Sequence, residues 1–110
     1  MADIPEDAQD KIRQLQMLEQ GLQQLLMQKQ AFQLQMMEIE SALKELDGAG
    51  EAYKIIGNIM VLTKREELDK ELKEKKETLE LRISSLEKQE TKTREKAASL
   101  QNDILSVIRK

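Results

Sequence analysis

The chain has 110 residues, of which 35% are charged and 2% are aromatic, and its formal net charge is −3. It contains no cysteine and no histidine, which excludes disulfides, thiolate nucleophiles, imidazole acid–base catalysis and zinc sites of the usual kind. Such a composition is unsuited to a compact globular core and typical of a coiled coil. No apolar run approaches the length of a membrane span, so we expect a soluble, cytoplasmic protein that makes no membrane contact.

The first predicted element is a helix over residues 4–47, with Pro5 in its first turn and a left-handed Gly48 at its end. Inside it, positions three and four apart form the unbroken seam of a coiled coil, with Lys29 as a polar exception. The seam residues are Leu15, Leu18, Leu22, Leu25, Lys29, Phe32, Met36, Ile39, Leu43 and Leu46. Met17, Met27 and Met37 lie off this seam, and either helix packing or adaptable contact with a partner remains open for them.

Residues 52–63 predict a β-hairpin, because two runs rich in β-branched residues flank Gly57-Asn58. A two-residue turn at this point places Ile56 opposite Ile59 and sets the register of the other pairs. One face of the hairpin then carries Tyr53, Ile55, Met60 and Leu62, while the opposite face carries Lys54, Ile56, Ile59 and Val61.

The last predicted element is a helix over residues 64–108, which has its own seam. The seam residues are Leu72, Lys76, Leu79, Ile83, Leu86, Glu90, Thr93, Ala97, Leu100, Ile104 and Val107. Because the chain reverses at the hairpin, the two helices must run antiparallel. We therefore predict a mainly α fold and a single domain over residues 1–110. Its two helices form a long antiparallel coiled coil, and a β-hairpin lies between them in the chain.

The predicted hairpin is apolar on both faces, whereas a sheet with one wet face alternates apolar with polar residues. An isolated two-stranded sheet is marginally stable, and its bare edges invite pairing with other chains. We infer an obligate oligomer in which hairpins of several chains pair edge to edge into a closed or stacked sheet; a connector that folds locally is the alternative. The assembly residues would be Tyr53, Ile55, Ile56, Gly57, Asn58, Ile59, Met60, Val61 and Leu62.

Apolar residues also gather at the helix ends farthest from the hairpin. They either form a binding surface for a partner or complete the last layers of the seam, and the sequence leaves both readings open. These residues are Ile4, Ala8, Ile12, Leu100, Ile104, Leu105 and Ile108.

We predict neither catalysis nor a bound metal or cofactor. The carboxylates lie along solvated helix faces, and Gly48-Ala49-Gly50 lacks the spacing of a phosphate-binding loop. Neither helix has the dense basic face that nucleic-acid binding requires, so we expect no nucleic-acid partner.

The hairpin and its flanks resemble the β-class subunits of the prefoldin family, most of all the archaeal kind. Residues 53–61, YKIIGNIMV, are similar to the family pattern Y-K-x-x-G-x-x-φ-V, with φ an apolar residue. Residues 64–68, KREEL, and 86–90, LEKQE, fit the second helix of the family, and residues 28–30, QKQ, fit the first. The likeness covers nearly the whole chain.

The resemblance implies an ATP-independent holdase chaperone. It implies a heterohexamer of two α-class and four β-class subunits whose hairpins build a double β-barrel platform. Non-native polypeptide clients would be held near the helix ends and delivered to a group II chaperonin, with Arg109 and Lys110 near the docking region. A coiled-coil adaptor with one fixed folded partner is the alternative function.

Overall fold

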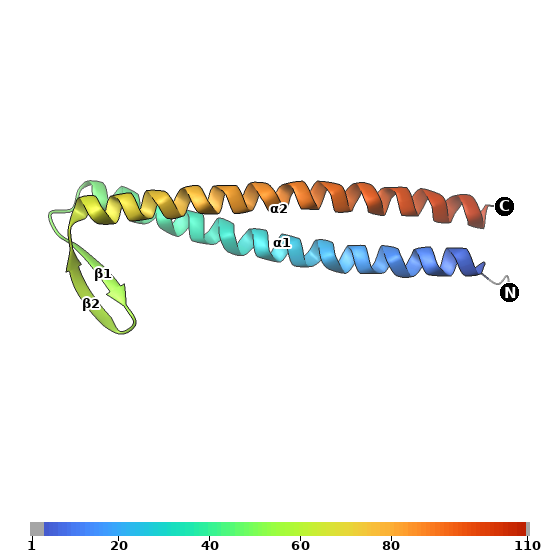
Figure 1. The fold of residues 1–110 in the computed structure, drawn as a ribbon, viewed down its shortest axis with the longest axis horizontal. Coiled ribbons are helices and arrows are strands. Elements are labelled where there is room, and N and C mark those ends of the chain that lie inside the picture. The colour runs from blue at the N-terminus through green and yellow to red at the C-terminus, as the bar shows by residue number, and fades with distance from the viewer. Residues whose placement is uncertain (1–3, 110) are drawn as a thin grey trace. The chain divides into compact units, whose positions relative to one another are not determined.

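A computed structural model describes residues 4–109 and has four elements in the order helix, strand, strand, helix (Figure 1). The elements are α1 (Glu6–Asp47), β1 (Ala52–Ile56), β2 (Ile59–Thr63) and α2 (Arg65–Ile108). This confirms the predicted mainly helical fold with an antiparallel hairpin between two long helices. Lys110 lies outside the described residues.

Pro5 directly precedes the first helical residue. Its carbonyl accepts the backbone N–H of Gln9 at 3.0 Å, which closes the first turn of α1. Since proline has no N–H to leave unsatisfied, it suits this place at the start of a helix.

The shielded residues of both helices follow the predicted seams. Every predicted seam position is half-buried or buried, and the same spacing continues toward the N-terminus through Lys11 and Ala8. The off-seam methionines Met17, Met27 and Met37 are exposed. The 3.5-residue repeat therefore identified correctly which side of each helix is covered.

The described residues fall into two compact units, the residues up to Lys29 with those from Ser85 onward, and Gln30–Ser84. In each unit a segment of α1 lies beside a segment of α2 that runs the other way (Figure 1). The buried residues are Ala8, Leu86 and Ile104 in the first unit and Leu46, Ala52 and Leu79 in the second. Each core is thus a narrow seam made of small and aliphatic side chains.

The end of α1 differs from the prediction for Gly48. Gly57 is the only glycine with positive φ, so Gly48 does not adopt the left-handed conformation. Instead, the Ala49 N–H donates to the Leu46 carbonyl at 3.2 Å, a tightened last turn. The Arg65 guanidinium also donates to the carbonyls of Asp47 at 2.7 Å and Ala49 at 3.3 Å. A cation from α2 therefore binds the carbonyl of the last residue of α1 and a carbonyl of the loop that follows.

The hairpin has the predicted register. Ile56 pairs with Ile59, Ile55 with Met60, Lys54 with Val61 and Tyr53 with Leu62. Gly57 has a φ of 60° while Asn58 stays at negative φ, which is the pattern of a type II′ turn. Only one of the two turn residues therefore uses the left-handed region.

Candidate functional site

The outer face of the hairpin, defined as Tyr53, Ile55, Met60 and Leu62, is open to solvent. All four side chains are exposed, up to 69% for Ile55. Neither helix of the chain covers this face. Exposed apolar patches often mark surfaces that contact another protein, so this face is a candidate for such a contact.

The inner face, defined as Ala52, Lys54, Ile56, Ile59, Val61 and Thr63, is shielded in part. Ala52 is buried, and Lys54 and Thr63 are half-buried near the start of α2. Toward the turn the shielding ends, and Ile59 is 66% exposed. Shielding thus falls from the base of the hairpin to its tip.

Both edges of this sheet are unpaired within the described residues, because it consists of β1 and β2 alone. Each outer edge therefore offers backbone N–H and C=O groups to another strand. All nine predicted assembly residues, Tyr53, Ile55, Ile56, Gly57, Asn58, Ile59, Met60, Val61 and Leu62, are exposed. The structure brings them together on one element.

Lys54 is the only charged residue in the two strands, and its ammonium group is paired with a carboxylate of α2. Its Nζ lies 2.7 Å from Glu71 Oε1 on α2. The hydrogen bond from Lys54 lowers the pKa of the Glu71 carboxyl against the opposing effect of burial. Periodicity could not reveal this contact, since the two residues lie in different elements.

The predicted residues at the helix ends separate into two groups. Ala8 is fully buried and Ile104 is 8% exposed, while Ile12 and Leu100 are half-buried, so these four belong to the seam. The remaining three, Ile4, Leu105 and Ile108, are exposed. We name these three the end cluster.

Two polar exceptions in the seams contact each other, which the sequence reasoning missed. Lys29 Nζ lies 3.2 Å from Glu90 Oε2, with both side chains largely shielded. Arg94 also donates to Glu90, and the hydrogen bonds from Arg94 and then Lys29 lower the Glu90 pKa. The sequence could have predicted this ion pair, because one seam contains a lysine and the other a glutamate of opposite charge.

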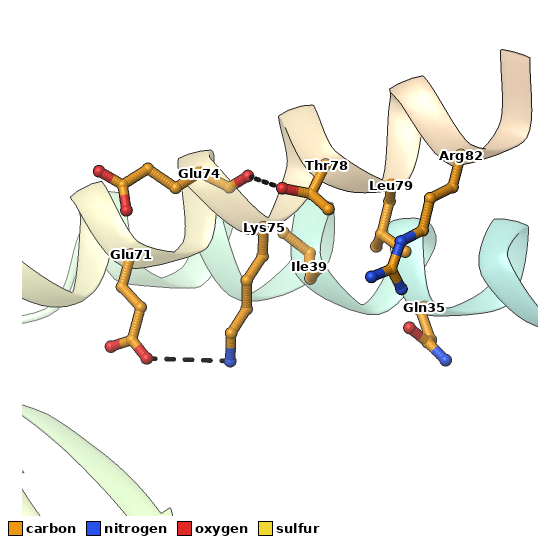
Figure 2. Close-up of a pocket in the computed structure, with 8 residues that line it drawn as sticks. All are labelled: Gln35, Ile39, Glu71, Glu74, Lys75, Thr78, Leu79 and Arg82. Carbon is orange, nitrogen blue, oxygen red and sulfur yellow. Dashed lines mark hydrogen bonds and ion pairs between the residues drawn. The ribbon is translucent and has the colours of Figure 1, made fainter. Parts of the chain in front are cut away.

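A groove of about 460 Å³ lies between α1 and α2 in the second unit. Figure 2 shows Ile39 and Leu79 toward its floor and Glu71, Lys75 and Arg82 along its rim. Lys75 Nζ lies 3.8 Å from the Glu71 carboxylate, and Arg82 stands 5.7 Å from the centroid of the Phe32 ring. The first contact lies within α2, and the second joins α2 to α1.

Within residues 4–109, no group of three or more acidic side chains is arranged to hold a metal ion. Neither α1 nor α2 carries an apolar stretch long enough to cross a membrane.

Comparison with known proteins gives full-length matches. Residues 9–110 match the family model described as Prefoldin subunit. The prefoldin subunit beta of Archaeoglobus fulgidus is 40% identical, over 98% of this chain and 96% of that protein. The prefoldin subunit beta of Thermococcus onnurineus is 39% identical, over 99% of this chain and 97% of that protein.

The fold agrees with a solved structure of the same kind. The crystal structure of the prefoldin beta subunit from Thermococcus strain KS-1 matches with a TM-score of 0.92 and 39% identity, covering 100% of this chain and 99% of that one. The chain therefore belongs to the prefoldin family of chaperone subunits, whose members assemble with other prefoldin subunits, and it matches beta-type members along its whole length.

Proposed function

We propose that this chain is a β-class subunit of a heterohexamer with two α-class and four β-class subunits. The hexamer is an ATP-independent holdase that binds non-native polypeptides and delivers them to a group II chaperonin in the cytoplasm. The whole chain acts as one prefoldin domain, with its hairpin for assembly and its helix ends for clients. The observation that carries the proposal is the exposure of apolar side chains on both faces of the hairpin.

Assembly follows from the free energy of burying that surface. Each large apolar side chain moved from water into an interface contributes roughly 1.5–3 kcal/mol. The hairpin exposes seven such side chains, and a second hairpin joined at an edge also satisfies unpaired backbone groups. The seven are Tyr53, Ile55, Ile56, Ile59, Met60, Val61 and Leu62. We assign this surface to the hairpins of other prefoldin subunits, which would cover it on assembly.

Client binding is assigned to the end cluster, Ile4, Leu105 and Ile108. These are exposed apolar residues near the chain ends, and they bind apolar segments of an unfolded polypeptide weakly. Several subunits in one hexamer make such contacts at once, so the effective concentration of each further contact is high. Weak single contacts then retain a client without any nucleotide.

The test uses the hexamer formed with an α-class subunit and a chemically unfolded protein diluted into buffer. Replacing the end cluster by Ile4→Ser, Leu105→Ser and Ile108→Ser is expected to abolish suppression of aggregation while the hexamer keeps its mass. The matched control replaces three exposed methionines of α1 by serine: Met17→Ser, Met27→Ser and Met37→Ser. This control is expected to protect the client as well as the wild type does.

Loss of protection in the methionine variant but not in the end-cluster variant would place client contacts along α1 instead of at the chain ends. No protection by the wild-type hexamer would overturn the holdase function and favour an adaptor with one folded partner.

A further inference from the structure

The two faces of the hairpin differ in their contact with the rest of the chain. No helix covers the outer face, whereas the base of the inner face lies against the start of α2. Met60 and Ile59 are neighbours in β2 with nearly equal exposure, 64% and 66%, yet they belong to opposite faces. The two faces are therefore equally exposed near the turn, and they differ at the base, where Lys54 and Thr63 of the inner face are half-buried near α2.

The connection between the hairpin and α2 is short. Only Lys64 separates the end of β2 from the start of α2, so the sheet has a single residue about which to swing. On the other side, residues 48–51 link the hairpin to α1 as a loop with two glycines, and Arg65 holds this loop to α2 at the Ala49 carbonyl but does not reach the strands. An additional contact is needed to hold one orientation of the sheet against α2.

The Lys54–Glu71 pair supplies that contact. It joins the third residue of β1 to the second turn of α2 at 2.7 Å, and both side chains are more than half shielded from solvent. In Figure 2 the Glu71 carboxylate projects from α2 toward Lys75, whose Nζ is 3.8 Å away and adds a second positive charge. Glu71 thus lies between two cations, one on the hairpin and one on its own helix.

We propose that the Lys54–Glu71 pair is a positioning contact that holds the inner face toward α2 and presents the outer face to the hairpins of other prefoldin subunits. The inference rests on the proposed hairpin assembly and specifies its geometry. A sheet held in one orientation loses less conformational freedom when it joins its neighbours, and this preorganisation strengthens assembly. If the sheet turned its inner face outward, Lys54 would enter the interface as an unpaired charge, which opposes that arrangement.

The first experiment measures hairpin orientation in the isolated chain, before any assembly. The chain has no cysteine, so Asn58→Cys at the turn and Glu77→Cys on α2 give two unique sites for spin labels. We expect a narrow distance distribution in the parent and a broader one in Glu71→Gln. Asp69→Gln is the control, because it removes a carboxylate paired with Lys73 at 2.8 Å on the same helix, without contact to the hairpin. The control is expected to keep the parent distribution.

The second experiment measures assembly with an α-class subunit as a function of concentration. Glu71→Gln is expected to raise the midpoint concentration about two- to fivefold, the range for a partly exposed ion pair, while Asp69→Gln leaves it unchanged. The double variant Lys54→Met/Glu71→Gln tests coupling of the two residues. The double variant is expected to weaken assembly by less than the sum of the losses in free energy of assembly caused by Lys54→Met alone and Glu71→Gln alone.

The variants Met60→Asp and Ile59→Asp test separately how the outer face and the inner face contribute to assembly. A carboxylate on the outer face would be buried without a partner, so Met60→Asp is expected to weaken assembly at least about tenfold more than Ile59→Asp. Helicity measured by circular dichroism checks that each variant is folded.

The inference is overturned if Glu71→Gln and Asp69→Gln give the same distance distribution, or if Ile59→Asp blocks assembly as strongly as Met60→Asp. If the wild-type chain fails to assemble at all, the proposed function fails instead. The distance measurement still decides whether the pair positions the hairpin, because it needs no partner subunit.

Discussion

Gly57 and Gly21 lie in different backbone conformations, and only one of these conformations requires glycine. Gly57 has a φ of 60° in the turn, where side chains with a Cβ atom are strained. Gly21 lies inside α1, and a Cβ placed on it would meet no atom within 4 Å. The first position therefore requires glycine, and the second only tolerates it.

Substitution of each glycine by alanine should have effects of opposite sign. Gly57→Ala is expected to destabilise the hairpin by about 1–2 kcal/mol, seen as faster amide exchange in β1 and β2. Gly21→Ala is expected to stabilise the helices by about 0.5–1 kcal/mol, seen as a higher unfolding temperature. A hairpin that keeps its amide protection in Gly57→Ala would contradict the assigned turn.

Glu90 connects local charge to stability at low pH. Hydrogen bonds from Arg94 and Lys29 hold its pKa below the ordinary value of 4.5, so the folded chain favours the ionised form more than the unfolded chain does. This contribution is complete above the ordinary pKa and is lost as the pH falls through the lowered one. Stability should therefore fall on acidification through this window.

The variant Glu90→Gln isolates that effect. Its unfolding temperature is expected to lie below that of the wild type at about pH 6, with a gap that narrows toward about pH 3. Glu95→Gln is the control, since Glu95 forms no ion pair within residues 4–109 and its gap should be smaller. A Glu90→Gln gap that stays constant with pH would refute this linkage.

At the scale of elements, the end of α1 depends on a residue of α2. Arg65 donates to the carbonyls of Asp47, the last residue of α1, and of Ala49, and it lies 3.8 Å from the Asp47 carboxylate. Arg65→Met is expected to loosen the last turn of α1 by about 1 kcal/mol, measured as faster amide exchange over residues 44–47. Lys64→Met, which removes an exposed neighbouring cation, should leave these amides unchanged. Equal acceleration in both variants would remove Arg65 from this role.

The elements themselves could be predicted from local sequence, and the contacts between them could not. The repeat of three and four residues gave both seams, and Gly57-Asn58 fixed the register of the hairpin, because each depends on neighbours along the chain. The Arg65 contacts and the Lys54–Glu71 pair join residues 16 to 18 positions apart, for which periodicity carries no information. Gly48 was predicted wrongly for the same reason, since Arg65 satisfies the carbonyls near it.

Periodicity also left the helix ends undecided. It grouped all seven apolar residues there without separating covered from exposed ones. The structure shows that Ala8 and Ile104 complete the seam, whereas Leu105 and Ile108 face solvent. Which of them contact clients stays a prediction that the serine variants test.

At the scale of the whole molecule, the chain buries very little on its own. Its cores are seams, and its most apolar element is also among its most exposed. Family membership explains why an apolar hairpin is exposed in the single chain, because prefoldin subunits assemble with one another. The proposed hexamer would bury the hairpin and leave the helix ends free for clients.

The mass of the mixture with an α-class subunit, measured by light scattering, tests this account most directly. The wild-type chain is expected to form a hexamer. Ile55→Asp should abolish it, because the outer face cannot bury an unpaired carboxylate, whereas Leu81→Asp, at an equally exposed apolar residue of α2, should assemble normally. A hexamer formed equally well by Ile55→Asp would contradict the claim that the hairpin holds the subunits together.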